Sequence, residues 1–254
     1  MFIVITSLIL PTILNASSVS AQFSLVPGPP RFASGPSQRN ALILSPISSY
    51  DPWRPEDLAI IQNALIQAGY NVTYVENTAV TLNLLTTQLN NYNVVIWRSQ
   101  VYEHNHITYY LVGQMNNPTT QQAYASDFSS GWIDDSNGIL GASIDFFTSH
   151  ISQGSLPNVK LMILIASMSD SLASTFLSAG VRSIIEFTGV FSMQFGFADD
   201  IVTGIVEYLA QGNSVANSVA LVINPYRDIV LEDPLDSPNI PNVAYTGDST
   251  GTIT

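Results

Sequence analysis

The chain has 254 residues, of which 46% are hydrophobic and only 10% are charged, and its formal net charge is −12. An acidic chain repels phosphate backbones and anionic lipid headgroups, which argues against nucleic acids and anionic membrane surfaces as partners. The absence of cysteine excludes a disulfide framework, a thiolate metal site and a cysteine nucleophile.

An apolar amino-terminal segment predicts an export signal over residues 1–21. Phe2 to Leu14 is mostly apolar, and the small residues Val19-Ser20-Ala21 fit the pattern that precedes a cleavage point. The apolar run is shorter than the roughly 20 residues that span a bilayer. We therefore expect a secreted or cell-surface protein that does not insert into the membrane after signal removal. The alternative interpretation is a buried amino-terminal strand or helix.

Three further segments follow the signal. Residues 22–39 are rich in proline and glycine without apolar periodicity, which predicts a linker. Residues 40–222 alternate apolar runs with amphipathic stretches and form the predicted domain. Within this domain, Pro118 to Gly138 is polar and predicts a long insertion or a small antiparallel hairpin. Residues 223–254 contain few apolar clusters, which predicts a tail or an edge segment.

Five short apolar runs predict buried strands. They lie at Ala41–Leu44, Tyr70–Val75, Val94–Trp97, Leu161–Ile165 and Arg182–Phe187. Helical patterns separate and follow them, at Pro55 to Gly69, Thr81–Leu89, Ala142–Ser152, Leu172–Ala179, Asp199–Ala210 and Asn213–Val222. Because alternating strands and helices need crossover connections, the sequence predicts a three-layer α/β/α fold with one mainly parallel sheet. We expect the first strand between the second and third, and the fourth beside the third.

Two of these strands carry a recognisable pattern at their ends. Asn93 to Val101 reads NVVIWRSQV, and Asn158 to Ser169 reads NVKLMILIASMS. The first resembles a strand of the caspase–gingipain fold cysteine peptidases that ends in His-Gly, and the second resembles their next core strand, which ends in Ala-Cys. The helices and glycines from Ser174 to Gly180 and from Ile205 to Ala216 are also similar. The resemblance covers roughly Asn40 to Val222 and implies a caspase–gingipain-like fold.

The chain departs from that family at both catalytic positions. Gln100 stands where the resemblance places the catalytic histidine, and Ser167 stands where it places the cysteine. A thiol titrates at about 8.5 and is strongly nucleophilic, whereas a serine hydroxyl requires a general base. Glutamine cannot accept a proton at neutral pH. The resemblance therefore implies a pseudopeptidase, for which we expect no catalytic residue and no cofactor.

Two histidines close to Gln100 suggest other chemistry. His104 or His106 could replace the missing base and activate Ser167. With Glu103 they also form a candidate metal site, provided that the segment is extended and both imidazoles point to one face. The alternative is that all three are exposed loop residues, so no metal is expected. Separately, Asn71-Val72-Thr73 is a glycosylation sequon, which requires Asn71 to face outward.

These observations favour an exported, non-catalytic domain. It would bind a peptide, a protein or a cell-surface polymer at the carboxyl edge of the sheet, where open α/β sheets bind ligands. One alternative is a hydrolase that uses Ser167 with His104 or His106. The other is a periplasmic-type small-molecule binder. A hydrolase would place an imidazole within hydrogen-bond reach of Ser167 Oγ, and a periplasmic-type binder would show two lobes with a cleft.

Overall fold

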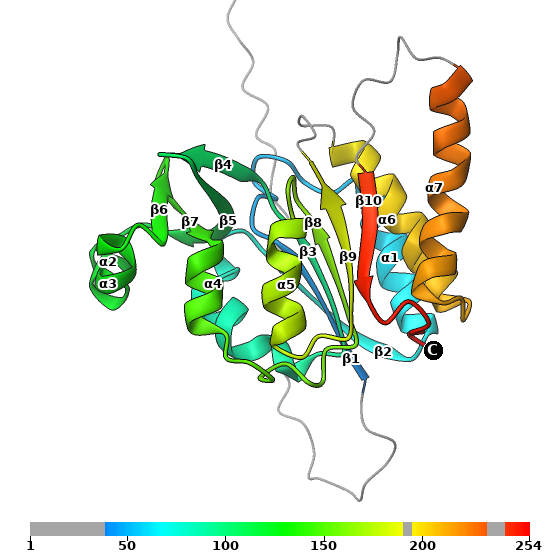
Figure 1. The fold of residues 1–254 in the computed structure, drawn as a ribbon, viewed down its shortest axis with the longest axis horizontal. Helices are drawn as coiled ribbons and strands as arrows, with labels where there is room; N and C mark the ends of the chain where they lie inside the picture. Colours follow the sequence, from blue (N-terminus) through cyan, green and yellow to red (C-terminus); the bar gives the residue numbers. More distant parts are fainter. Residues whose placement is uncertain (1–38, 190–194, 233–241) are drawn as a thin grey trace, which may run out of the picture. The chain divides into compact units, whose positions relative to one another are not determined.

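The computed structural model describes residues 39–189, 195–232 and 242–254 (Figure 1). All of them belong to one compact unit, Ser37–Thr254. The predicted signal at 1–21 and the predicted linker, except for Arg39, lie outside the described residues. None of the helices within these ranges is both long enough and apolar enough to span a bilayer.

A six-stranded sheet forms the centre of this unit, in the order β10-β9-β8-β3-β1-β2. Its strands are β1 (Arg39–Ser45), β2 (Tyr70–Glu76), β3 (Val94–Arg98), β8 (Leu161–Ile165), β9 (Ser183–Thr188) and β10 (Asn242–Gly247). Neighbouring strands are parallel except for β10, which runs antiparallel to β9 at the sheet edge. The predicted α/β class and the predicted strand order are both confirmed: β1 lies between β2 and β3, and β8 lies beside β3.

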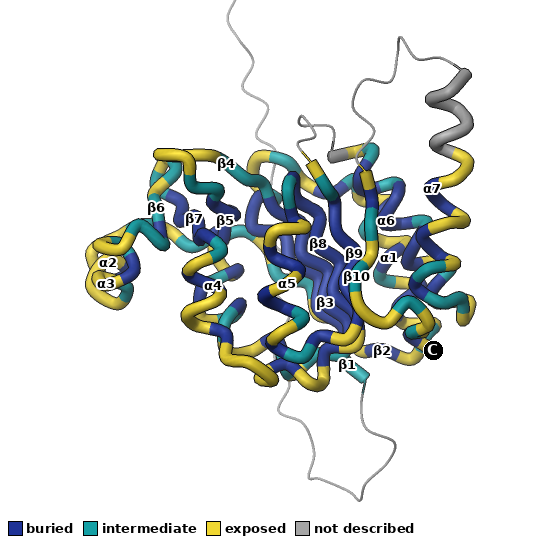
Figure 2. Tube along the Cα trace, in the orientation of Figure 1, coloured by how far each residue is buried: buried dark blue, intermediate teal, exposed yellow. Residues whose placement is uncertain are grey.

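Helices cover both faces of the sheet (Figures 1 and 2). One face packs against α1 (Pro55–Gln67), α6 (Phe195–Ala210) and α7 (Val215–Glu232). The other packs against the helical turn η2 (Leu84–Gln88), α4 (Ile144–His150) and α5 (Asp170–Ser178). Successive residues of β1 alternate between the two cores: Ile43 contributes to one and Leu44 to the other. Because both faces are covered, the central strands contain continuous apolar runs, such as Ala41 to Leu44 of β1 and Val94 to Trp97 of β3.

A second sheet is antiparallel and has the order β4-β5-β7-β6, of which the sequence patterns suggested only a hairpin near Pro118 to Gly138. Its strands are β4 (Val101–His104), β5 (Ile107–Met115), β6 (Ile133–Ser136) and β7 (Ile139–Ser143). Two-residue turns, Asn105-His106 and Asn137-Gly138, close its two hairpins with positive φ at both positions. These are the dihedrals of type I′ turns, whose twist matches that of the flanking strands.

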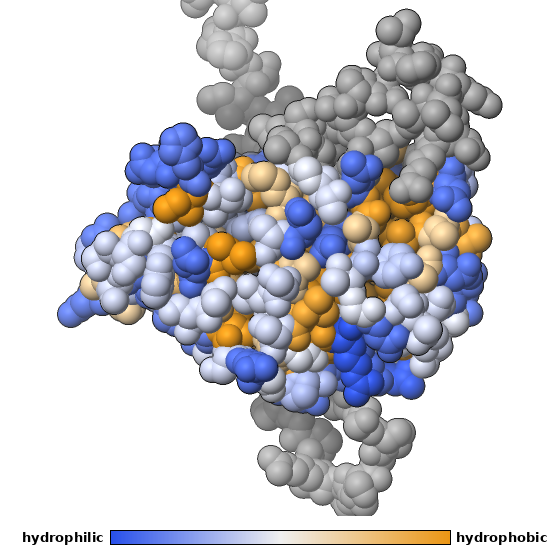
Figure 3. Space-filling view, viewed as in Figure 1, coloured by the Kyte–Doolittle hydropathy of each residue, from blue (hydrophilic) through white to orange (hydrophobic). Residues whose placement is uncertain are grey.

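The predicted insertion at 118–138 contains α2 (Pro118–Ala123), α3 (Ala125–Ser129) and β6. The helix predicted from Ala142 begins only at Ile144, because Ala142 and Ser143 still belong to β7 and Ser143 Oγ caps the helix by accepting from the Phe146 N–H. Short 3₁₀ turns, η1 (Asn77–Ala79) and η3 (Leu89–Asn91), flank η2. The face drawn in Figure 3 is mostly weakly polar, with small separate hydrophobic patches, as expected for a chain with few charges.

The carboxyl-terminal residues 248–254 tie several elements together. The helix predicted to end at Val222 continues through Pro225 to Glu232, and β10 then adds an edge strand. The residues that follow β10 accept hydrogen bonds from the start of α7: the N–H groups of Val215 and Ala216 donate to Gly251 O and Ser249 O. These bonds satisfy donors that the first turn of a helix leaves unpaired. Tyr70 of β2 donates its hydroxyl to Ile253 O at 2.8 Å.

We predict that Ile253→Ala lowers the free energy of unfolding by about 2–4 kcal/mol, because this side chain is 2% exposed and belongs to the core that α1, α6 and α7 cover. Urea unfolding followed by circular dichroism measures the change. The matched control is Ile66→Ala on α1, which is 57% exposed and should change stability by less than about 0.5 kcal/mol. Equal effects of the two substitutions would show that residues 248–254 are not held as described.

Candidate functional site

The parallel strands β1, β3, β8 and β9 end at one edge of the large sheet, and the residues that follow them form the candidate site. At this edge a loop leads from β1 to α1, Ser99 and Gln100 follow β3, and Ala166 to Ser169 follow β8. Such an edge is the usual ligand position in open α/β sheets.

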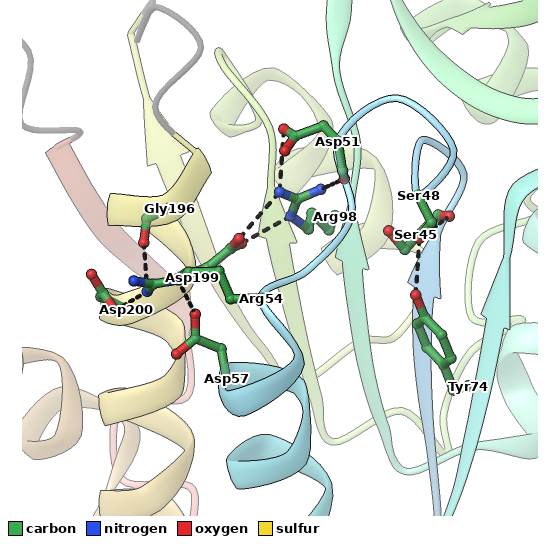
Figure 4. Close-up of polar contacts among 10 residues, drawn as sticks. All are labelled: Ser45, Ser48, Asp51, Arg54, Asp57, Tyr74, Arg98, Gly196, Asp199 and Asp200. Carbon is green, nitrogen blue, oxygen red and sulfur yellow. Dashed lines mark hydrogen bonds and ion pairs between the residues drawn. The ribbon is translucent and has the colours of Figure 1, made fainter. Parts of the chain in front are cut away.

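A buried arginine ends the central strand β3 (Figure 4). Arg98 is 0% exposed, and its Nε and Nη2 donate to the two carboxylate oxygens of Asp199 at 2.9 and 3.1 Å. Its Nη1 donates to Asp51 O at 2.6 Å, and Nη2 lies 3.2 Å from Asp51 Oδ2. The guanidinium also lies over the Trp53 ring, 5.3 Å from its centroid. Arg98 therefore joins β3 to α6 and to the loop after β1.

A second arginine extends this cluster toward solvent. Arg54 pairs with Asp57 of α1 at 2.6 Å and with Asp200 of α6 (Figure 4). Two guanidinium groups thus face four carboxylates, so the cluster carries an excess of negative charge. Burial raises the pKa of Asp199 to about 6, although its bonds to Arg98 act in the opposite direction.

The residues after β3 are held by hydrogen bonds to the second sheet and to β8. The Ser99 N–H donates to Ile165 O at 2.9 Å, and Ser99 Oγ donates to Leu111 O at 2.8 Å. The Leu111 N–H in turn donates to Gln100 O. These bonds fix the backbone of Gln100 between the two sheets.

Ser167 lies in the turn between β8 and α5 and is 8% exposed. The next residue, Met168, has a φ of +55°, which non-glycine residues rarely adopt. The backbone N–H groups of Met168 and Ser169 donate to the carbonyls of Gly189 and Phe187 at 2.9 and 3.1 Å. These two amides are therefore already bonded and cannot stabilise an oxyanion in this conformation.

A depression of about 480 Å³ lies between the loop after β1 and the second sheet. It is lined by Tyr50, Asp51, Gln100, Leu111, Ser136, Asn137 and Ile139. Gln100, one of the two replaced catalytic positions, thus faces the depression. Ser167, the other one, is not among the described residues that line it.

The structure places the two histidines on the second sheet rather than beside Ser167. His104 Nδ1 lies 2.7 Å from Asp134 Oδ2, and His106 Nδ1 lies 3.5 Å from Glu103 Oε1. Within the described ranges, neither imidazole hydrogen-bonds Ser167. The extended segment that a metal site would need is absent, because His106 lies in the β4–β5 turn. The described residues contain no group of three side chains suited to a metal ion.

Several site residues were not predicted from the sequence. Arg98 could have been noticed as a charge at the end of an apolar run. The helix predicted from Asp199 begins at Phe195 instead, so Asp199 lies inside α6, where it bonds Arg98. Tyr50 and Asp51 lie in an irregular loop that gives no periodic signal.

Asn71 fulfils the geometric condition set by its sequon. It lies on β2, the edge strand of the large sheet, and its side chain is exposed, as is that of Thr73. The amide Nδ2 lies 3.5 Å from Asn40 Oδ1, at the limit for a hydrogen bond.

Comparisons with known proteins add little. The sequence matches no protein-family model, and no curated protein sequence matches it. Among solved structures, the crystal structure of the Drosophila initiator caspase Dronc is similar, with a TM-score of 0.44 and 6% sequence identity, over 84% of this chain and 81% of that one. Similarity at this level does not place the chain in that family and says nothing about its chemistry.

We predict that Arg98→Met lowers the free energy of unfolding by about 3–5 kcal/mol, because it leaves the Asp199 carboxylate buried without its partner. Urea unfolding at about pH 7.5, where the wild-type Asp199 carboxyl with its pKa of about 6 is ionised, measures the loss. Adding Asp199→Leu should recover at least about 1 kcal/mol. Arg54→Met is the control, since this side chain is 42% exposed and should cost less than about 1 kcal/mol.

We also predict that Asn71 accepts an N-linked glycan when the chain passes through a secretory pathway that modifies Asn-x-Ser/Thr. Treatment with peptide-N-glycosidase F should increase gel mobility of the wild-type protein and leave Asn71→Gln unchanged. Thr73→Val should lose the glycan, whereas Thr73→Ser should keep it. An enzyme-sensitive band that persists unaltered in Asn71→Gln would refute this assignment.

Proposed function

We propose that this protein is an exported, non-catalytic domain that binds a peptide, a protein or a cell-surface polymer at the depression beside Gln100. The main support for this proposal is what the structure has at the ends of β3 and β8, where Gln100 and Ser167 lie. Gln100, which lines the depression, stands where the resemblance to caspase–gingipain peptidases would place a histidine. The amides that follow Ser167 are bonded to the carbonyls of Phe187 in β9 and of Gly189 just after it. The sheet edge thus keeps a concave surface, and its described residues are not arranged for peptide hydrolysis.

The hydrolase alternative has less support. A serine nucleophile needs a base within hydrogen-bond reach and donors aimed at the developing oxyanion. His104 and His106 instead lie next to Asp134 and Glu103. Ser167 itself is nearly buried in a tight turn. Neither requirement is met by the side chains and amides described above.

The periplasmic-type alternative would need two lobes with a ligand cleft between them. All described residues belong to a single compact unit, so this arrangement is not present among them. Export itself is supported by the apolar segment with small residues before position 22, which is a feature of the sequence alone.

Electrostatics narrows the ligands that fit the depression. Asp51 is the charged residue of its lining, and no cationic side chain is among the described lining residues. The adjacent arginines are already paired with carboxylates, and the whole chain carries a net charge of −12. A neutral or cationic ligand is therefore favoured over an anionic one.

We expect that a fluorophosphonate probe does not label the full chain and that peptide libraries are not cleaved, because the three imidazoles pair with carboxylates instead of Ser167. Proton transfer to a base contributes a roughly 10²–10⁴-fold acceleration. Gel fluorescence and mass spectrometry measure these outcomes, with trypsin as the positive control and Ser167→Ala as the matched variant. Labelling of Ser167 that disappears in His104→Ala or His106→Ala would make the protein a serine hydrolase.

A further inference from the structure

Most polar side chains that line the depression lack hydrogen-bond partners among the described residues, unlike the polar side chains at the nearby strand ends. The hydroxyls of Tyr50 and Ser136, the side-chain amide of Asn137 and Asp51 Oδ1 make no hydrogen bond with other described residues. By contrast, the Ser99 hydroxyl a few residues away is fully engaged within the fold. The rim therefore presents donors and acceptors that the protein does not use for its own structure.

An aromatic ring stands beside these groups. Tyr50 is 63% exposed, the largest exposure among the big hydrophobic side chains in the described ranges. Its ring can pack on the apolar face of a pyranose, while carboxylate and amide groups bond to the hydroxyls at the sugar's edge. The volume of about 480 Å³ is within the range of ordinary ligand pockets.

Strand pairing argues against an extended peptide in the same place. Peptides often add to a sheet through an unpaired strand edge. Gln100 follows β3, which is paired on both sides, and β5 and β7, which supply Leu111 and Ile139, are also paired on both sides. The edge strand β6 contributes only its last residue, Ser136. A peptide main chain would thus find no continuous strand edge in the depression.

We infer that the depression binds a neutral carbohydrate chain, with Tyr50 as the stacking platform and Asp51, Ser136 and Asn137 as the hydrogen-bonding groups. This inference rests on the proposed binding function and names its ligand class. Anionic polysaccharides are disfavoured by Asp51 and by the net charge of −12.

The test is titration of the full chain with cellohexaose, maltohexaose and chitohexaose at up to about 5 mM, followed by Tyr fluorescence and NMR. At least one hexasaccharide should bind, and Tyr50→Ala should weaken it by about tenfold or more, whereas Tyr50→Phe keeps the ring and should change affinity by less than about threefold. Tyr245→Ala is the matched control, because Tyr245 is 41% exposed on β10 and lines a different pocket.

Tyr50→Ala is expected to fold normally, because its side chain is exposed, and its urea midpoint should equal that of the wild type. Failure of all three sugars to bind, or equal weakening by Tyr50→Ala and Tyr245→Ala, would overturn the inference. If instead a peptide library yields a ligand whose binding depends on Tyr50, the carbohydrate assignment is refuted but the proposed binding function is supported. Fluorophosphonate labelling of Ser167 would reject the binding function itself.

Discussion

The buried charge of Arg98 constrains the whole carboxyl edge of the sheet. An ion removed from water costs several kcal/mol unless other groups replace its hydration, and here Asp199 and Asp51 do so. Asp199 must therefore stay at the place where α6 passes β3, and the loop after β1 must fold so that the Asp51 carbonyl reaches the guanidinium. The same loop holds Tyr50. The carboxylates that neutralise Arg98 thus also fix the loop after β1, which forms one wall of the depression.

Two close contacts at glycines help to hold the second sheet, which forms the opposite wall. A Cβ atom on Gly141 of β7 would lie 2.6 Å from the Tyr102 ring, so this glycine lets the ring cross the sheet and stack on Tyr109. A Cβ on Gly113, which has a φ of +53°, would lie 2.0 Å from Asn77 O. Gly113 therefore allows β5 to approach the turn that follows β2. Both walls are therefore held by contacts within the protein itself.

The parallel sheet was predictable because its strands are covered on both faces and are consequently apolar runs between helical patterns. The second sheet was much harder to predict. Its strand β4 is short and its exposed residues do not alternate clearly, and β5 contains an irregularity near Gly113. Gln100 could be assigned to the carboxyl edge from its place after Trp97. Its neighbours in the depression could not, since Tyr50 and Asn137 come from a loop and a turn that only tertiary packing brings together.

The distribution of hydrogen bonds separates structural from available polar groups. Ser99, Ser169 and Tyr110 all bond backbone carbonyls, so the segments after β3 and β8 have little freedom to rearrange into a catalytic geometry. The rim groups remain available, and their backbone is held by the Arg98 cluster on one side and by a type I′ turn on the other. A surface that is already ordered loses little conformational entropy when a ligand binds. A small entropy loss matters most for a repetitive polymer, because each of its units makes only weak contacts. Affinity for such a polymer then depends on how little the protein must reorganise to make these contacts.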